Sequence, residues 1–134
     1  MTHRATYQVC REKVREFASA VGETSPLHHD PEAARNEGFQ DVVAPPMFAA
    51  VYCSPAIGPA LLDPRYGIDF ARLLHAAQEF TWHQPVVAGD EIETTAELAD
   101  TTERAGMKYF TFTTRSTNQR GELVCEGTWT NLVR

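Results

Sequence analysis

The chain has 134 residues, of which 43% are hydrophobic and 22% charged, and its formal net charge at pH 7 is -6. This length fits one domain with one hydrophobic core, and we expect residues 1–134 to form it. The composition is that of an ordinary globular protein and excludes a disordered chain. The charged residues are spread along the chain without a basic cluster, which argues against nucleic acid or an anionic membrane surface as a partner.

The three cysteines, Cys10, Cys53 and Cys125, are far apart and form no Cys-x-x-Cys pair. This pattern indicates neither a disulfide framework nor a zinc site, so we expect reduced thiols and no metal or other cofactor. The first residues lack the apolar run of a signal peptide, and no stretch is long and apolar enough to span a bilayer. We therefore expect a cytoplasmic protein.

The first half of the chain has helical periodicity. In residues 10–21 apolar side chains recur every three or four positions, and Gly22 follows as a stop signal. Asp30 at the N-cap and Pro31 at the first helical position predict a second, short helix that ends near Gly38.

A third helix is predicted over residues 46–53, which are apolar on nearly every face. A helix of this kind belongs in a protein interior. Pro55 and the Gly58-Pro59 pair predict that the helix ends or bends there, so residues 54–67 are expected to be a loop-rich connection.

The second half changes to the period of two that is typical of strands. We predict strands at 80–83, 91–98, 108–116 and 122–133. Turn signals lie between them at Pro85, at Gly89-Asp90 and at residues 118–121. Helices followed by antiparallel strands predict an α+β fold in which a sheet wraps a central buried helix.

Three residues with acid–base chemistry, Glu23, His28 and Asp30, lie on the loop between the first two predicted helices. A carboxylate and an imidazole that converge on one water can exchange protons with it near neutral pH, which suits reversible addition of water to a double bond. The alternative interpretation is a solvated polar loop in which Asp30 only caps the following helix.

The segment Gly22-Glu23-Thr24-Ser25-Pro26-Leu27-His28-His29-Asp30-Pro31 resembles the hydratase motif of MaoC-like dehydratases, Gly-Asp-x-Asn-Pro-x-His-x-Asp. Residues 32–35, 43–48 and 74–80, with the Pro85 and Gly89-Asp90 signals, are similar to N-terminal MaoC-like domains and to accessory subunits of mycolic-acid-type dehydratases. The resemblance covers nearly the whole chain and implies a hot-dog fold.

By this resemblance the protein is an (R)-specific enoyl-thioester hydratase or, in reverse, a 3-hydroxyacyl-thioester dehydratase, acting on acyl-CoA or acyl-ACP. His28 matches the catalytic histidine, Glu23 the catalytic aspartate, and Ser25 the asparagine that shapes the loop. Two residues depart from the motif. Glu23 carries its carboxylate one methylene further out than aspartate does, and Ser25 lacks the side-chain amide.

The start of the third helix is suited to bind negative charge that develops on a thioester oxygen. Because Pro45 and Pro46 have no N–H, the donor is expected at Met47 or later, or before the prolines at Ala44. The acyl chain is expected to lie along the apolar faces of the helix and strands, and the candidate contacts are Met47, Phe48, Tyr52, Phe80 and Trp82.

The resemblance also implies a homodimer, or a heterodimer with a MaoC-like hot-dog subunit. A non-catalytic acyl-binding subunit, whose partner supplies the catalytic dyad, stays open, because Ala44-Pro45-Pro46 is similar to such subunits. His28 argues against it, since those chains often lack this histidine. A thioesterase ranks last, because residues 47–53 contain no carboxylate.

Overall fold

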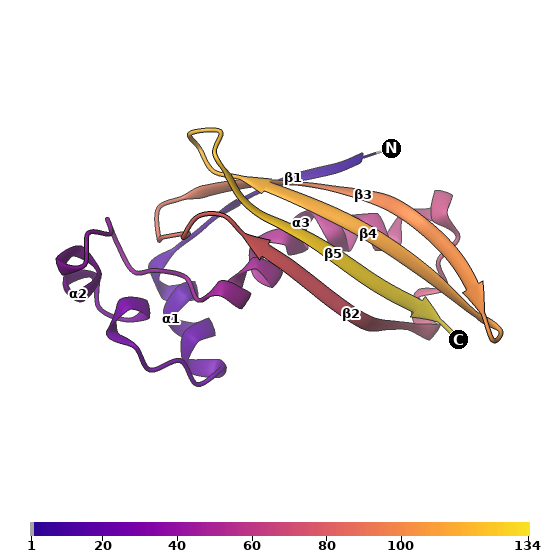
Figure 1. The fold of residues 1–134 in the computed structure, drawn as a ribbon, viewed down its shortest axis with the longest axis horizontal. Helices are drawn as coiled ribbons and strands as arrows, with labels where there is room; N and C mark the ends of the chain where they lie inside the picture. The colour runs from indigo at the N-terminus through magenta and orange to yellow at the C-terminus, as the bar shows by residue number, and fades with distance from the viewer. Residues whose placement is uncertain (1) are drawn as a thin grey trace.

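The computed structural model describes residues 2–134, which form helices and strands in an order close to the predicted one (Figure 1). The first half contains β1 (Thr2–Gln8), α1 (Arg11–Ala20), α2 (Pro31–Asn36) and α3 (Ala49–Leu62). Short 3₁₀ turns at Pro26–His28 and Pro46–Phe48 precede α2 and α3. The second half contains β2 (Leu73–Trp82), β3 (Glu91–Arg104), β4 (Met107–Thr117) and β5 (Leu123–Val133).

The strands within residues 2–134 form one antiparallel sheet in the order β1-β3-β4-β5-β2. Sequential hairpins join β3 to β4 and β4 to β5, whereas β2 pairs with β5 and lies at the edge opposite β1. The turn signals at Pro85 and Gly89-Asp90 therefore belong to a connection that crosses the sheet. Within that connection Val87 forms an isolated antiparallel bridge with Val43.

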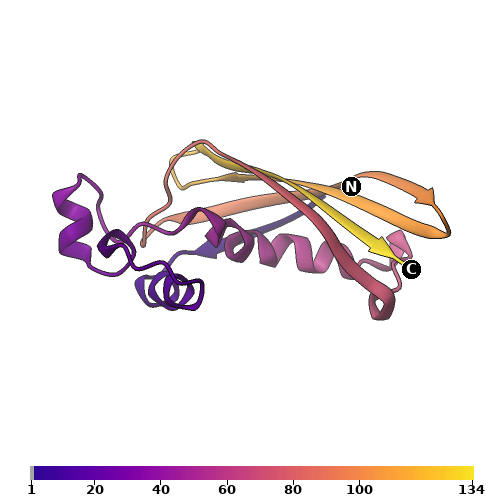
Figure 2. The ribbon, with the colours of Figure 1, turned by 60° about the horizontal axis from the view of Figure 1, so that its bottom comes forward.

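Helix α3 lies along one face of the sheet, which curves around it (Figure 2). Its buried residues include Tyr52, Cys53 and Ile57, which join Ile92 and Phe112 of the sheet in the main apolar cluster. The sheet wrapped around a central helix confirms the predicted α+β architecture.

The predicted end of this helix is wrong, because α3 continues through Pro55 and Pro59 to Leu62. Both prolines are exposed. The carbonyls that lose an N–H partner to a proline therefore lie on the solvent side, where water can replace that partner. Burial of the opposite face stabilises the helix, so tertiary packing outweighs the local signal in residues 54–67.

Strand β1 was not predicted from the sequence. Its alternating side chains are only half-buried, and two of them, His3 and Ala5, are weak strand signals. The strand forms because its backbone pairs with β3 along its whole length, from Thr2 opposite Glu97 to Gln8 opposite Glu91.

Helices α1 and α2 gather at one end of the sheet (Figure 1, Figure 2). The Asp30 carboxylate accepts a hydrogen bond from the Glu32 N–H at 2.9 Å, so this residue is the predicted N-cap of α2. No helix within residues 2–134 combines the length and apolar character needed to cross a bilayer.

Candidate active site

The ring of His28 is held by a backbone carbonyl. The residue ends the 3₁₀ turn that Ser25 caps, with the Ser25 hydroxyl accepting from the Leu27 N–H at 3.3 Å. Nδ1 of His28 lies 2.6 Å from the carbonyl oxygen of Val43. Because a carbonyl oxygen can only accept, Nδ1 carries the hydrogen, and Nε2 of the neutral ring presents a lone pair. The imidazole is therefore oriented to accept a proton at Nε2.

Glu23 lies beside this lone pair, with its carboxylate oxygen Oε2 4.0 Å from Nε2 of His28. Gly22, with a φ of +76°, turns the chain at the end of α1 and brings Glu23 to this position. The separation is too long for a direct hydrogen bond. An oxygen placed about 2.8 Å from both atoms would have its two partners about 90° apart, close to the angle between the two hydrogens of a water. A water or substrate hydroxyl therefore fits between them.

The side chains differ in exposure. That of Glu23 is 50% exposed and that of His28 is 12% exposed. The backbone around them is fixed, because Nε2 of His29 lies 2.7 Å from the Glu23 carbonyl oxygen. The Val43 N–H also donates to the Leu27 carbonyl at 2.8 Å, so two hydrogen bonds join the His28 turn to the segment that leads into α3.

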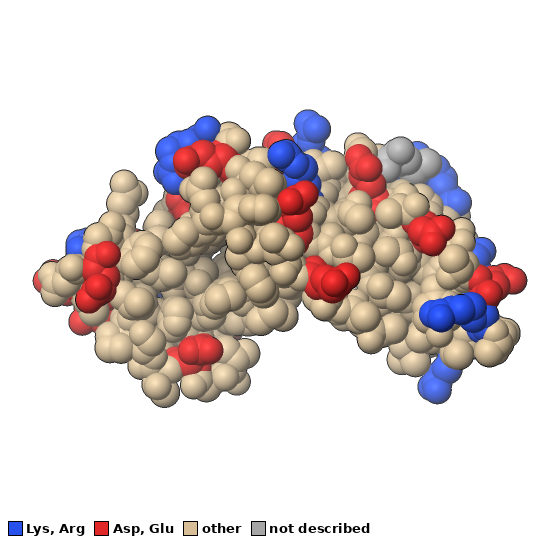
Figure 3. All heavy atoms as spheres, viewed as in Figure 1, with Lys and Arg blue, Asp and Glu red and all other residues tan. Residues whose placement is uncertain are grey.

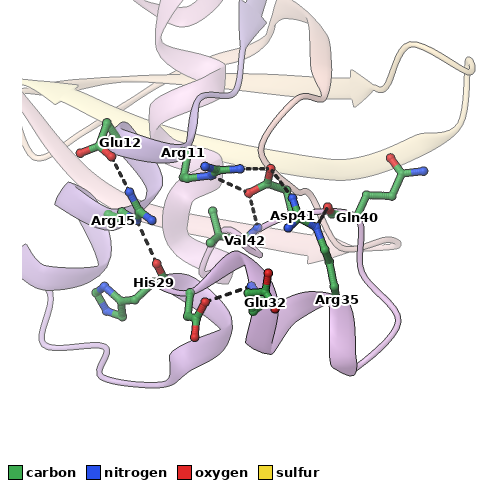
Figure 4. Close-up of polar contacts among 10 residues, drawn as sticks. Arg11, Glu12, Arg15, His29, Glu32, Arg35, Gln40, Asp41 and Val42 are labelled. Atoms are coloured by element: carbon green, nitrogen blue, oxygen red, sulfur yellow. Dashed lines mark hydrogen bonds and ion pairs between the residues drawn. The ribbon is translucent and has the colours of Figure 1, made fainter.

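A polar network ties this loop to α1 (Figure 4). Arg11 donates two hydrogen bonds to the Asp41 carboxylate, at 3.0 and 2.8 Å, and Asp41 also accepts from the Val42 N–H. Arg15 donates to the carbonyl of His29 at 2.9 Å. The hydrogen bonds from Arg11 hold the pKa of Asp41 below its ordinary value. Two arginines of α1 thus fix both sides of the loop that carries the histidine.

A mostly apolar cavity of about 320 Å³ opens beside His28. The α1–α2 end meets the sheet near a hollow in the surface view (Figure 3). The cavity walls come from the loop, the start of α3 and the end of β2 with the connection that follows it. The lining residues are His28, Val43, Ala44, Pro45, Pro46, Tyr52, Trp82, His83, Gln84, Pro85 and Val86.

Three of the residues predicted to contact substrate line this cavity with His28, namely Ala44, Tyr52 and Trp82. Tyr52 is 3% exposed, and burial raises the pKa of its phenol. Trp82 remains 45% exposed, and its indole N–H donates to the Pro46 carbonyl at 2.8 Å. This contact joins the end of β2 to the start of α3 across the cavity.

The other predicted contacts lie outside the cavity lining. Ser25 caps the turn, and Met47 is 48% exposed. Phe48 is fully buried, with its ring 5.4 Å from that of Phe17, and Phe80 packs edge-on against Trp129. Phe48 and Phe80 thus pack against other aromatic rings, outside the cavity lining.

The backbone donors at the start of α3 can now be distinguished. The Ala44 N–H donates to the Val86 carbonyl at 2.8 Å, so it is already used. The Phe48 N–H donates to the Pro45 carbonyl at 2.9 Å, and Pro46 has no N–H. The N–H of Met47, at the second position of the 3₁₀ turn, has no acceptor within that turn. Met47 follows Pro46, which lines the cavity, so its N–H is the donor of this stretch next to that lining with no acceptor in the turn.

Sequence reasoning missed the wall formed by residues 83–86, which follow β2. The sequence marks Pro85 as a turn signal but does not show that these residues line a cavity, because their place depends on how the connection from β2 to β3 packs in the tertiary fold. Val43 was also missed as the partner of His28, since any residue can supply a backbone carbonyl.

The fold and the loop–helix site define a hot-dog protein, and comparison with known sequences identifies the family. Residues 1–127 match the family described as FAS1-like, dehydratase domain region. A UPF0336 protein of Saccharopolyspora erythraea is 43% identical over 128 residues, which are 96% of this chain and 82% of the relative. The chain therefore belongs to the FAS1-like dehydratase-region family of MaoC-like proteins.

Solved structures agree with this assignment. The HadBC (3R-hydroxyacyl-ACP dehydratase) complex of Mycobacterium tuberculosis superposes with a TM-score of 0.84 at 31% identity, over 98% of this chain and 94% of that chain. A MaoC-like dehydratase superposes with a TM-score of 0.80 at 32% identity, over 98% of this chain and 41% of that chain. The predicted hot-dog fold and MaoC-like family are thereby confirmed.

Proposed function

We propose that the protein is an (R)-specific enoyl-thioester hydratase, and in reverse a 3-hydroxyacyl-thioester dehydratase, with Glu23 and His28 as its catalytic residues. The observation that carries the proposal is the fixed orientation of His28. Its Nδ1 hydrogen is committed to the Val43 carbonyl, and its Nε2 faces the Glu23 carboxylate beside an apolar cavity. Membership of a dehydratase family supports the same reaction.

In this mechanism one water lies between Nε2 of His28 and the carboxylate of Glu23. The carboxylate accepts one of its hydrogens and orients it. Nε2 removes the other proton as the water oxygen bonds to C3 of the enoyl group. The C2–C3 π electrons move toward the thioester, whose oxygen gains negative charge opposite the Met47 N–H. The imidazolium then returns the proton to C2, so that one water has been added and His28 is neutral again.

The cavity fits this chemistry because most of its lining is apolar and can bind an acyl chain, while His28 lies in the same lining. Tyr52 lies in the wall, and its phenol stays neutral because burial raises its pKa. A carboxylate–imidazole pair beside an apolar surface stabilises charge better than the same pair in open water.

The test is hydration of crotonyl-CoA by the purified protein, followed as loss of absorbance of the conjugated double bond. His28→Ala and Glu23→Gln should each lower kcat by about 10²- to 10⁴-fold, which is the usual contribution of a positioned acid or base. Glu16→Gln is the matched control, because it makes the same carboxylate-to-amide change on the exposed face of α1, outside the cavity lining. Near wild-type turnover in both site variants would refute the assignment.

We also propose that the protein works as a dimer, joined across β2, with a second copy or a MaoC-like hot-dog subunit. In the sheet of residues 2–134, β2 is an edge strand that pairs with β5. Phe70, Leu74 and Trp82, in and beside it, are 57%, 43% and 45% exposed. An unprotected edge with exposed apolar side chains favours association.

A non-catalytic acyl-binding subunit is the second candidate function. The half-exposed Glu23 and the similarity to a chain of the HadBC complex favour it. In that case the purified protein would be folded but inactive, and co-expression with a MaoC-like partner would give activity that His28→Ala in this chain does not reduce.

A further inference from the structure

A second hollow, of about 430 Å³, lies at the far end of the sheet from the cavity described above, where β3 turns into β4. Its lining contains Arg72, Arg104, Lys108 and Arg134 together with one carboxylate, Glu103. Figure 3 shows Lys and Arg at this end of the molecule, with acidic side chains close by. In a chain of net charge -6 this is a local excess of positive charge.

These cations differ from most others in the protein because they lack acidic partners. Among the Lys and Arg side chains of residues 2–134, seven form ion pairs within 4.0 Å and five do not. Four of those five line this hollow, and the fifth is Arg115. Unpaired cations that share one hollow repel one another, so an external anion stabilises them.

The fold explains why the cations meet. Leu73 of β2 lies opposite Val133 of β5, Val133 opposite Lys108 of β4, and Lys108 opposite Glu103 of β3. One row across four strands therefore brings together the start of β2, the end of β5 and the β3–β4 turn. Arg72 precedes this row in the sequence.

Two of the cations are held in place by aromatic rings rather than carboxylates. The Arg104 guanidinium lies 4.5 Å from the ring centroid of Tyr109, and Nζ of Lys108 lies 5.2 Å from that of Phe110. A ring contact orients a cation without neutralising it. Tyr109 and Phe110 are adjacent on β4 and face opposite sides of the sheet, so the two cations reach the hollow from its two sides, each still able to form charge-assisted hydrogen bonds with phosphate.

Within one chain the hollow is remote from the cavity, because Arg72 and Trp82 lie at opposite ends of β2, a ten-residue strand of about 30 Å. Pairing across β2 changes this. When such a strand pairs antiparallel with its two-fold copy along its whole length, Leu73 of one copy lies opposite Trp82 of the other. Arg72 of one copy then lies at the cavity mouth of the second copy, where Trp82 and His83 form the lining.

We propose that this basic hollow binds the phosphate groups that terminate the pantetheine arm of the acyl thioester, and that each hollow serves the cavity of the chain paired across β2. The inference rests on the proposed function and adds a binding site for the carrier. The pantetheine arm is uncharged, so the phosphates at its end are the groups that the cations can recognise. Coenzyme A and a carrier protein both supply such a phosphate.

The test compares crotonyl thioesters of pantetheine, 4′-phosphopantetheine and coenzyme A, with dissociation constants measured by calorimetry on the assembled protein. The phosphorylated thioesters should bind about tenfold more tightly than the pantetheine thioester, as expected for one charge-assisted contact. Arg104→Glu should abolish this preference and leave affinity for the pantetheine thioester unchanged. Arg115→Glu is the matched control, since it makes the same charge change outside the hollow and should have no effect.

The outcomes separate the two proposals. Failure of the wild-type protein to bind even the pantetheine thioester would refute the proposed function, and the carrier site with it. Equal affinity for all three thioesters, or a phosphate preference that survives Arg104→Glu, would refute the basic hollow alone. A preference shown only by the coenzyme A thioester would overturn the assignment to the phosphate at the end of the pantetheine arm, because 4′-phosphopantetheine carries that phosphate too.

A mixed dimer tests whether the hollow acts across β2. One chain carries His28→Ala, and the other carries Arg104→Glu. If the hollow serves the paired chain, both changes fall in one composite site. The other site then stays intact, with about half the wild-type turnover and an unchanged KM for crotonyl-CoA. If the hollow serves its own chain, the active site that remains shows a raised KM, and the cross-chain assignment is wrong.

Discussion

The substitution Gly127→Ala tests the packing between the middle of β5 and its two neighbouring strands. Gly127 pairs with Phe80 of β2 and with Thr114 of β4. A Cβ at this position would lie 2.6 Å from Oγ1 of Thr114 and 3.0 Å from the Phe80 ring. Thr114 is 4% exposed, and its Oγ1 accepts from the Trp129 indole at 2.9 Å. The hydroxyl therefore cannot move without breaking a buried hydrogen bond.

Overpacking of a buried site costs about 1–3 kcal/mol, and loss of the Trp129–Thr114 hydrogen bond adds about 1 kcal/mol. The free energy of unfolding of Gly127→Ala should therefore fall by roughly 2–4 kcal/mol. For a domain of this size each kcal/mol corresponds to about 4 °C in Tm, so the Tm should fall by roughly 8–16 °C. Thermal unfolding followed by circular dichroism measures the change.

A double-mutant cycle isolates the cause. Thr114→Ala removes the atom with the closest approach, so Gly127→Ala should cost less in that background by about 1–2 kcal/mol. The same cost in both backgrounds, or an unchanged Tm for the single Gly127→Ala variant, would show that the strands separate freely and that the packing argument is wrong.

Three further predictions concern the helical end and the thiols. Because Arg11 lowers the pKa of Asp41, the stability from this pair is complete above about pH 4 and is lost as the pH falls through the lowered pKa. Asp41→Asn should cost about 1 kcal/mol near pH 7 and progressively less as the pH falls below about 4, a pattern checked by Tm against pH, whereas a constant difference would contradict the ion pair. Asp30→Ala removes the N-cap of α2 and should speed amide exchange in that helix by about fivefold, corresponding to about 1 kcal/mol, with equal exchange contradicting the cap. Cys10 is exposed while the other two thiols are buried and have raised pKa values, so a thiol reagent at about pH 8 should modify one cysteine per native chain, and Cys10→Ser should abolish the reaction.

The sequence predicted the elements whose signal is local. The caps at Gly22 and Asp30 and the alternation in residues 91–98 and 108–116 placed four elements, namely α1, α2, β3 and β4, close to their observed positions. The continuation of α3 could not be predicted, because Pro55 is a local stop signal that only the buried opposite face outweighs. Strand β1 and the pairing of β2 with β5 could not be predicted, because they depend on contacts between segments that lie far apart in the sequence.

In the candidate site, too, the sequence indicates the residues that are close in the chain and misses those that only the tertiary fold brings together. His28 and Glu23 share one short loop, so the spacing of the motif indicates both of them. The structure places their nearest side-chain atoms 4.0 Å apart. The Val43 carbonyl and the wall at residues 83–86 depend on the tertiary fold and carry no residue-type signal. The sequence also could not say where Met47 and Phe48 point. An apolar residue at the start of a helix can face solvent, as Met47 does, or the core, as Phe48 does, instead of a ligand.

The peptide of Val43 has a consequence for how such a site can diversify. Its carbonyl orients the His28 ring and its N–H binds the same turn, while four residues later the chain offers the Met47 N–H at the start of α3. In the proposed mechanism, one segment therefore orients the proton-transfer group and supplies the donor for the thioester oxygen. Under that mechanism a change at Pro85, on the opposite wall, alters the room for the acyl chain without touching this segment, whereas Trp82 is bonded to the Pro46 carbonyl within it. If the proposed function holds, substitutions at Pro85 should therefore change the preference for acyl chains more than the rate of proton transfer.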